Sequence, residues 1–523
     1  MNRETMQCVI LVTSDIHGYI HPLDYRTGEE TSSGLAKLAA LIKEERKKSP
    51  ELLLIDNGDM LQGSPFAAYA AAYGAKVHPC IEVMNGLSYD AAVPGNHEFN
   101  FGLAKLRSAV SGSEFPWLAA NIVSEREPAF GKPYLVKSIG GKLKVAILGV
   151  TTHYIPYWEN PSHIAGLAFL DALESVKEWA AYIRKHEQPD LLIVSYHGGF
   201  ERHLDTGQAT ERLTGENQAY AICMEVPGID VLITGHQHRC LAGEWNGVAI
   251  VQTGCNGQAL GQITVDAQRQ EGRWEVSGKT VRLLEPGLHI AADEQVMALT
   301  EEVERRTQEW LDQPIGRTEG KLLIEDPFEC RKAPHPFVQF IHQVQIEATG
   351  AELSVAALLS EESRGFEAII TMRDVLSAFV YPNTLRVLRL TGEDIRLALE
   401  QSAAYFDLGQ DGRLKVSEDY LTPKAQHYNY DMWSGIEYDI DLSFPVGERI
   451  TRLTRNGEEL YRDAEYTVVM NSYRAGGGGN YDMFRGKPIL YEGAADMAEL
   501  AAEYIRSRGI IKAMDTDSWQ IIW

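Results

Sequence analysis

The sequence has too few cysteines, too widely scattered, for a disulfide-stabilised scaffold. Its 523 residues include six cysteines, and no two of them form a CxxC pair. Small secreted scaffolds and closed structural zinc sites both need clustered cysteines, so this spacing argues against both classes. We expect ordinary buried thiols in a reducing compartment at Cys8, Cys80, Cys223, Cys240, Cys255 and Cys330.

Positive charge is also scarce. The chain carries 49 lysines and arginines against 73 aspartates and glutamates, which gives a formal net charge of −24. Such a negative field repels polyanions, so we expect no long nucleic acid as a partner. A small phosphate ester is not excluded as a substrate, because bound metal ions reverse the local sign of the charge.

Long apolar runs are missing as well. No stretch approaches the length that a transmembrane helix needs, so we expect no membrane partner. The first residues, MNRETMQCVILVTSDIHG, contain neither a long apolar run nor a small-residue cleavage site. We therefore expect a cytoplasmic protein.

What is present describes a well-packed globular protein of more than one domain. Hydrophobic residues make up 44% of the chain and aromatic residues 9%, without internal repeats or low-complexity tracts. Short apolar runs that end in polar clusters recur through the first half: CVILVTSD, ELLLIDNGD, KVAILGVT, DLLIVSYHG and DVLITGHQH. Amphipathic helical patterns lie between these predicted strands, and this alternation predicts an α/β layered domain.

The pattern changes between residues 286 and 315. ADEQVMALTEEVERRTQEWLDQ is a polar amphipathic helix with no strand to pair it, and we interpret this segment as a connector. This connector separates a first domain, residues 1–285, from a second domain, residues 316–523, which is α+β in character. A length of 523 residues is too great for one ordinary core and agrees with two domains.

Metal-binding residue types stand at the ends of the predicted strands. They are Asp15 and His17, Asp59, Asn96 and His97, His197, and His236 and His238. Ligands of open α/β folds gather outside the carboxyl ends of the strands. Each group alone has a common structural explanation, such as a turn or a hydrogen-bonded histidine, and Asn96 alone could equally be a helix cap. Packing needs do not explain five groups together, so the set predicts a metal site.

The chain resembles the calcineurin-like metallophosphoesterases of the 5′-nucleotidase family, and within it the 2′,3′-cyclic-nucleotide 2′-phosphodiesterase/3′-nucleotidases. The segments that carry the resemblance are DNGDMLQGSP, VPGNHEFNFG, EVPGIDVLITGHQH, VYPNTLRV and NYDMWSGIEYDID. The resemblance implies an α/β fold in which a four-layer αββα-type sandwich precedes a C-terminal α+β substrate-binding domain. Members of this family are often exported, whereas the first residues here carry no signal.

The resemblance also implies a role for each residue. Two divalent metal ions (Mn, Zn, Fe or Co) would be bound, one by Asp15, His17 and His238 and the other by Asn96, His197 and His236, with Asp59 bridging both. His97 would protonate the leaving oxygen. Asn100 would orient His97 without adding charge, since 5′-nucleotidase-type relatives resemble GNHEFD at this point. Glu98 and the two phenylalanines of this segment are expected to be structural.

In the second domain the resemblance places the base of a nucleotide between Tyr381 and Tyr473, with Asn383 near its edge or the ribose. Core packing is the alternative for each tyrosine. The GGGIR segment of 5′-nucleotidases is missing, with Arg364 as a candidate replacement. We therefore expect a 2′,3′-cyclic nucleotide 2′-phosphodiesterase with 3′-nucleotidase activity and a small nucleotide substrate. A 5′-nucleotidase or nucleotide-sugar hydrolase is the alternative, and an inactive nucleotide-binding protein, marked by a broken ligand set, is a remote one.

Overall fold

A computed structural model describes residues 4–73, 77–381, 383–422 and 424–523 of the chain. The chain forms two compact units, Met1–Thr307 and Gln308–Trp523, and the division falls inside helix α7 (Glu294–Leu311). The first unit is α/β and the second α+β, so the predicted fold class is confirmed.

Two sheets form the centre of the first unit. One has the order β14 (Arg273–Leu284), β13 (Leu260–Gln270), β1 (Thr5–Thr13), β2 (Leu53–Asp56) and β3 (Ala91–Ala92). The other has the order β11 (Cys240–Trp245), β12 (Val248–Thr253), β10 (Val231–Ile233), β9 (Leu191–His197), β7 (Leu143–Thr151) and β6 (Tyr134–Ile139). The predicted buried strands of the first half correspond to β1, β2, β7, β9 and β10.

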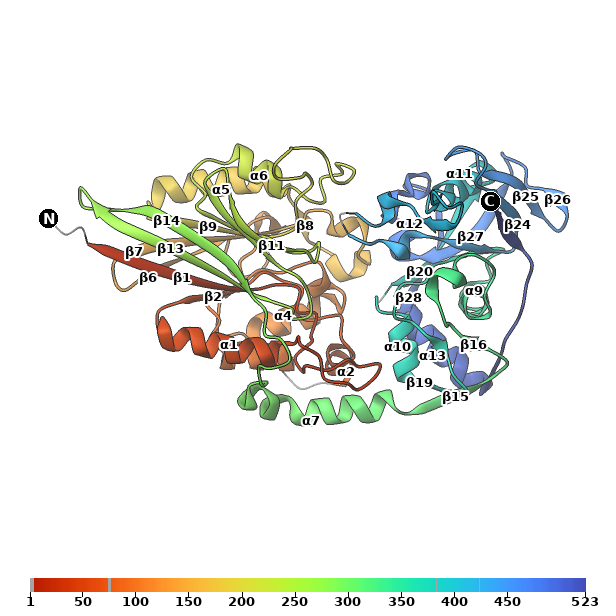
Figure 1. Ribbon diagram of the computed structural model, residues 1–523, viewed down its shortest axis with the longest axis horizontal. Helices are drawn as coiled ribbons and strands as arrows, with labels where there is room; N and C mark the ends of the chain where they lie inside the picture. Colours follow the sequence, from red (N-terminus) through yellow and green to blue (C-terminus); the bar gives the residue numbers. More distant parts are fainter. Residues whose placement is uncertain (1–3, 74–76, 382, 423) are drawn as a thin grey trace. The chain divides into compact units, whose positions relative to one another are not determined.

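Alternate residues of the strands determine how the layers pack. Ile10 of β1 and Ile55 of β2 belong to the same buried cluster as Ile147 of β7 and Ile193 of β9, so the two sheets enclose one core. The opposite face of the second sheet packs against α5 (Ala172–His186) and α6 (Ala219–Glu225). Helix α1 (Leu35–Lys48) covers the outside of the first sheet, as Figure 1 shows, and the result is the four-layer αββα arrangement.

Parallel pairing brings the functional stretches to common edges. Strands β1, β2 and β3 run parallel, with Thr13 opposite Asp56 and Asp56 opposite Ala92. Strands β7, β9 and β10 also run parallel. The loops that follow β1, β2 and β3 therefore leave their sheet side by side, as do those that follow β9 and β10.

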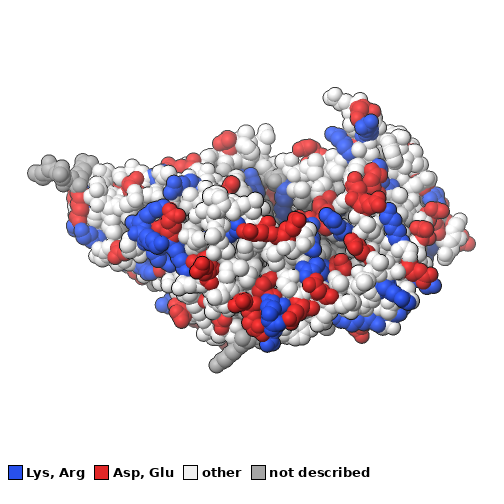
Figure 2. Space-filling view, turned by 60° about the horizontal axis from the view of Figure 1, so that its bottom comes forward, with Lys and Arg blue, Asp and Glu red and all other residues white. Residues whose placement is uncertain are grey.

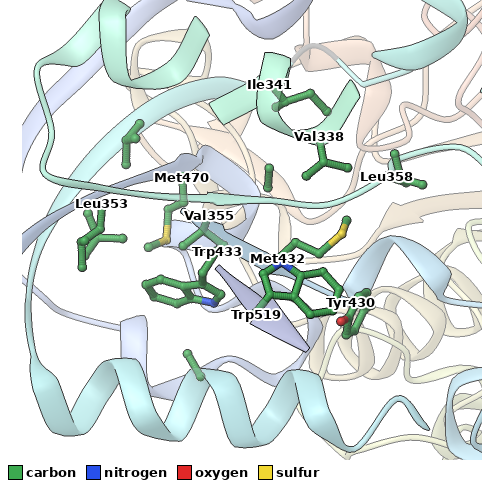
Figure 3. Packing of buried hydrophobic residues seen from close by; sticks show 14 of the residues in the cluster. Val338, Ile341, Leu353, Val355, Leu358, Tyr430, Met432, Trp433, Met470 and Trp519 are labelled. Atoms are coloured by element: carbon green, nitrogen blue, oxygen red, sulfur yellow. The ribbon is translucent and has the colours of Figure 1, made fainter. Parts of the chain in front are cut away.

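The second unit is built around a sheet of the order β23 (Met432–Ser434), β17 (Leu353–Ala356), β27 (Glu465–Asn471), β20 (Thr384–Thr391) and β28 (Ile489–Asp496). Helices α9 (Pro336–Thr349), α11 (Gly392–Ala403) and α13 (Met497–Arg508) contribute to its core. Figure 3 shows part of this core, where Trp433 lies beside Leu353, Val355 and Met470.

The surface carries side chains of both charge signs and includes cysteine. Figure 2 shows acidic and basic side chains interspersed on the face that it presents. Within the described part of the chain, no helix is both long enough and apolar enough to cross a membrane. All six cysteines are thiols, but the expectation that all are buried is wrong, because Cys240 is exposed and Cys255 partly exposed. Cys240 begins β11, the edge strand of its sheet, and Cys255 lies in the loop after β12.

An ion pair is buried in the second unit. Arg474 Nε lies 2.7 Å from Asp431 Oδ2, and the two side chains are 2% and 3% exposed. Arg474 Nη1 also donates to the carbonyl of Gly478 and, at 3.3 Å, to Asn429 Oδ1. Burial raises the pKa of Asp431 to about 6, although the Arg474 guanidinium opposes this shift. Arg474 thus holds the glycine-rich turn of the second unit in place.

Removing the guanidinium should destabilise the second unit strongly. Arg474→Met leaves the Asp431 carboxyl buried without its partner, so we expect the unfolding free energy of this unit to fall by about 3–5 kcal/mol. The double substitution Arg474→Met, Asp431→Leu should recover most of this loss, because both charges are then gone. Denaturant unfolding measures both values. The exposed pair Arg389–Glu465 is the control, and Arg389→Met should cost less than about 1 kcal/mol. An equal loss in both single variants would contradict this account.

Candidate metal centre

Strained backbone conformations mark the site. Five of the seven candidate metal ligands have positive φ angles, between 52° and 67°: Asp15, His17, Asp59, His236 and His238. Residues other than glycine rarely adopt this left-handed region, although aspartate and histidine do so more readily than β-branched residues. Such strain persists only where the surrounding structure enforces it, and it concentrates at functional sites.

A first group of ligand atoms comes from the loops after β1 and β10. His17 Nε2 lies 3.0 Å from His238 Nε2. Asp15 Oδ1 lies 3.6 Å from the same His238 nitrogen. The ligand atoms of these three residues all lie within 4.8 Å of one another, which is close enough for one metal ion.

A second group comes from the loops after β2, β3 and β10 and from the last residue of β9. Asp59 Oδ2 lies 3.2 Å from His197 Nε2. Asn96 Oδ1 lies 2.9 Å from His236 Nδ1 and 3.2 Å from His197 Nε2. Asn96 does precede a short 3-10 helix, His97–Phe99, but its side chain makes no capping hydrogen bond. The helix-cap alternative therefore does not explain Asn96.

Asp59 belongs to both neighbourhoods. The Asp59 carboxylate forms one cluster with His197 and His236 and another with His17 and His97. Within each cluster the candidate ligand atoms lie within 4.8 Å of one another. Asp59 is 1% exposed, and its Oδ2 has no hydrogen-bond partner among the described residues, apart from the ion-pair contact with His197. A buried carboxylate oxygen without a hydrogen bond is costly, and a cation would satisfy it. The donor set of carboxylate, amide and imidazole thus fits divalent metal ions.

Partners outside the centre orient three of the imidazole rings. His17 Nδ1 donates to the carbonyl of Gln62 at 2.9 Å, and His197 Nδ1 donates to the carbonyl of Asn57 at 2.7 Å. His236 Nε2 donates to Glu216 Oε1 at 2.9 Å. In the neutral rings, these bonds place the lone pairs on Nε2 of His17 and His197 and on Nδ1 of His236, which are the atoms that face the centre.

Opposite charges are concentrated in this buried space. Burial lowers the pKa of His17 to about 4, so its ring is neutral at neutral pH, as metal binding requires. Burial also acts to lower the pKa of His197, but the carboxylates of Asp59 and Asp15 outweigh it and raise the pKa to about 10. Burial raises the pKa of Asp15. Positive charge in this space therefore favours the ionised carboxylates, as the neighbouring histidines do for Asp59, whose pKa lies well below its usual value although burial acts to raise it.

His97 lies beside these groups. Its Nδ1 lies 2.6 Å from Asn100 Oδ1, and its backbone N–H donates to Asp59 Oδ1 at 2.8 Å. The centroid of its ring is 5.2 Å from that of His17. Asn100 in turn donates from Nδ2 to Glu159 Oε2 at 2.7 Å, a contact that the sequence did not reveal. The pair predicted from GNHEFN is thus assembled at the edge of the candidate centre.

Glu98 occupies a structural position, as expected. Its buried carboxylate accepts the backbone N–H groups of Asp59 (2.8 Å), Met60 (2.7 Å), Leu61 (3.1 Å) and Gly95 (2.6 Å). It therefore ties the loop that carries Asp59 to the loop that carries Asn96 and His97. Phe99 is fully buried and packs edge to face against Phe169, which anchors the same turn.

The residues predicted to bind the base lie in the second unit. Tyr381 and Asn383 precede β20, and Tyr473 follows β27. Leu385 of β20 is opposite Asn471 of β27 in the antiparallel register, so the three residues belong to the same end of one strand pair. All three side chains are partly exposed. Their contact with a nucleotide stays a prediction.

The surroundings of the two tyrosines add a residue that the sequence analysis missed. The ring of Tyr428 lies edge to face with that of Tyr381, with centroids 6.3 Å apart. A Cβ at Gly478 would lie 2.5 Å from Cζ of Tyr473, so only glycine allows the backbone to cover that ring. Arg364 is exposed, and the structure assigns it no role in this group.

Two family matches divide the chain. Residues 8–240 match the calcineurin-like phosphoesterases, and residues 314–486 match the 5′-nucleotidase C-terminal domain. The seven candidate ligands all lie in the first match, and the candidate base-binding residues all lie in the second.

Relatives resemble the chain over nearly its whole length. A solved structure of a candidate 5′-nucleotidase from Staphylococcus aureus, in complex with alpha-ketoglutarate, is 33% identical, with a TM-score of 0.90, and the match covers 99% of this chain and 100% of that chain. The 2′,3′-cyclic-nucleotide 2′-phosphodiesterase/3′-nucleotidase of Salmonella typhimurium is 28% identical over 91% of this chain and 82% of its own length. The trifunctional nucleotide phosphoesterase of Bacillus subtilis is 28% identical over 98% of this chain, which spans 38% of that protein.

Divalent metal should stabilise the first unit. An ion that binds only the folded state at a free concentration of about 100 Kd adds about 2.7 kcal/mol per site, so Mn²⁺ should raise the Tm of the chelator-treated protein. Asp59→Ala should lose most of this rise, because Asp59 belongs to both ligand neighbourhoods. Differential scanning calorimetry with and without Mn²⁺ measures the rise in Tm of each variant. Asp56→Asn is the control: Asp56 bonds Thr13 Oγ1 at 2.7 Å, and its variant should keep the rise. An undiminished rise in Asp59→Ala would contradict the assignment.

Proposed function

This chain belongs to the calcineurin-like phosphoesterases that carry a 5′-nucleotidase C-terminal domain, and we propose that within this family it is a 2′,3′-cyclic-nucleotide 2′-phosphodiesterase with 3′-nucleotidase activity. Its relatives are named phosphoesterases and nucleotidases, so the chain is a hydrolase of phosphoester bonds. The observation that carries the finer proposal is the pairing of His97 with an amide, Asn100, in the GNHEFN segment. Similarity to the Salmonella typhimurium enzyme over 91% of this chain supports it.

The proposed metal ligands follow from the geometry of the two groups. Asp15, His17 and His238 would hold one ion, and Asn96, His197 and His236 the other, with Asp59 shared between them. Oxygen and imidazole donors suit Mn, Zn, Fe or Co. Two such ions, when bound, polarise the phosphoryl oxygens and lower the pKa of the water that attacks phosphorus.

His97 is proposed as the acid that protonates the leaving ribose oxygen. Its Nδ1–H donates to Asn100 Oδ1, which leaves Nε2 to carry the proton that is transferred. A positioned acid of this kind contributes roughly 10²–10⁴ in rate. Asn100 orients the ring but adds no charge to it.

The second unit is proposed to provide the preference for nucleotides. Tyr381 and Tyr473 would stack on the base, and Asn383 would bond its edge or the ribose. Stacking contacts the face of a base, which every base has, so we expect nucleotides with any base to be accepted. The binding energy of the base, which does not react, would serve to position the phosphate. We also propose a cytoplasmic location and small nucleotides as the substrates.

A second candidate function is 5′-nucleotidase activity. The 33% identity to the Staphylococcus aureus protein, solved as a candidate 5′-nucleotidase, favours it. The absence of GGGIR from the sequence and the amide at position 100 favour the cyclic phosphodiesterase instead.

A substrate panel separates the candidates. With Mn²⁺ present, we expect kcat/KM for 2′,3′-cyclic AMP and 3′-AMP to exceed that for 5′-AMP at least tenfold. Release of adenosine, 3′-AMP and inorganic phosphate, measured by chromatography, gives all three values. A preference for 5′-AMP would establish the second candidate, and no turnover of any substrate would establish an inactive binding protein.

Substitution of the tyrosines tests the role of the second unit. Tyr381→Ala and Tyr473→Ala should each lower kcat/KM for 2′,3′-cyclic AMP by roughly 1–3 kcal/mol, the value of one base stack. Neither should change hydrolysis of bis-p-nitrophenyl phosphate, which has no base. Tyr461→Ala is the matched control, since Tyr461 is an exposed tyrosine of the same unit. If a variant loses activity equally on both substrates, the tyrosines are packing residues instead.

A further inference from the structure

A buried carboxylate lies directly behind the His97–Asn100 pair. Glu159 is 59 positions after Asn100 in the chain, and its Oε2 accepts a hydrogen bond from Asn100 Nδ2 at 2.7 Å. Its side chain is 7% exposed. Glu159 lies in none of the sequence motifs described above, and neither set of candidate ligands includes it.

The orientation of Glu159 is itself determined. Its other oxygen, Oε1, accepts the backbone N–H of Asn160 at 2.7 Å and lies 3.0 Å from His163 Nδ1. The preceding residue, Trp158, stacks on the ring of His236, with centroids 5.3 Å apart and an angle of 22° between the rings. The turn between β7 and β8 (Ala168–Phe169) is therefore held against the candidate centre at two consecutive residues.

An ionised carboxylate only accepts hydrogen bonds, whereas an amide has one donating end and one accepting end. Because Glu159 faces Asn100, the NH₂ end of the Asn100 amide must point to it. The oxygen end then points to His97 Nδ1, so that nitrogen must carry a proton. Glu159 thus determines which nitrogen of His97 is protonated in the neutral ring.

We propose that Glu159 is a positioning residue of the reaction: acting through Asn100, it keeps the proton of neutral His97 on Nδ1 and leaves Nε2 as the atom that exchanges a proton with the leaving group. This inference rests on the proposed role of His97. It also explains the amide at position 100. An aspartate there would place a second carboxylate at hydrogen-bond distance from Glu159, and two such carboxylates repel unless they share a proton.

Glu159→Gln should remove this control. If the introduced glutamine keeps its oxygen on the Asn160 N–H, its NH₂ group faces the NH₂ group of Asn100. Two donors cannot bond, so the Asn100 amide should turn over and present its NH₂ end to His97. The proton of neutral His97 then moves to Nε2. We expect kcat/KM for 2′,3′-cyclic AMP to fall about 10- to 100-fold, and hydrolysis of bis-p-nitrophenyl phosphate to fall far less, because nitrophenolate leaves without protonation.

The exchanged pair Asn100→Asp, Glu159→Gln provides the sharpest comparison. Here the NH₂ group of the introduced glutamine donates to the introduced aspartate, whose other oxygen accepts the Nδ1–H of His97. The double variant should therefore recover most of the activity on 2′,3′-cyclic AMP. Asn100→Asp alone should not, because it leaves two carboxylates together. A recovery in the double variant requires that residues 100 and 159 act on His97 as a unit.

The site of the His97 proton is measured directly by NMR on the full chain, labelled with ¹⁵N-histidine and loaded with diamagnetic Zn²⁺. His97→Ala assigns the signal. We expect the proton on Nδ1 in the wild type and the double variant, and on Nε2 in Glu159→Gln. Glu201→Gln is the control, since Glu201 is also buried but accepts the N–H groups of Tyr220 (3.0 Å) and Ala221 (2.9 Å). This variant should leave the His97 signal unchanged.

An unchanged His97 signal in Glu159→Gln would overturn the inference. So would equal losses on both substrates, or a double variant no better than Glu159→Gln. If Glu159→Gln does not fold, the double variant and Asn100→Asp decide by the same signal. A wild type that prefers 5′-AMP would refute the proposed substrate but not this inference, because the NMR measurement needs no substrate and the kinetic comparison can be repeated with 5′-AMP.

Discussion

The Asp59 carboxylate is the group on which the arrangement of the candidate centre depends. One oxygen accepts the N–H of His97, and the other faces His197. Its own loop is tied by Glu98 to the loop that carries Asn96. A single side chain therefore joins the ends of β2, β3 and β9, and it lies in a buried space where a carboxylate needs a cation beside it.

Strain and outer hydrogen bonds explain how such a centre is kept in place. Left-handed backbone at His236 and His238 aims two side chains from one loop at different neighbours. The carbonyls of Gln62 and Asn57 and the carboxylate of Glu216 then select the ring nitrogen that faces inward on three histidines. Asn100 and Glu159 do the same for His97. Each of these four imidazoles is thus oriented by a partner outside the candidate ligand set.

The two units divide the work of the proposed reaction. All seven candidate ligands and His97 belong to the first unit, so the proposed metal chemistry draws on residues of that unit alone. In the second unit, Tyr473 lies beside a glycine-rich turn that Arg474 supports, and Tyr381 is in ring contact with Tyr428. The buried Arg474–Asp431 pair there holds a loop in place.

Five buried strands of the first half, the helix between the two units and the candidate ligands could be predicted from the sequence. Buried strands such as β9 are continuous apolar runs, and a ligand at a strand end needs only a local pattern to be recognised, as with Asp15 and His17 after β1. Burial of every cysteine was wrongly expected, because Cys240 lies on an edge strand whose pairing the local sequence does not reveal.

Only the tertiary structure decided which atoms act. Glu159 meets Asn100 across 59 residues, and Glu216 meets His236 across 20, from turns that have no distinctive pattern. The ring of Tyr428 likewise contacts that of Tyr381, which lies far from it in the sequence. A hydrogen bond depends on the placement of single atoms within a few tenths of an ångström, and that placement comes from the packing of the whole unit. Sequence alone determined which residue types stand at the strand ends, whereas packing determined which nitrogen of each oriented histidine faces the centre.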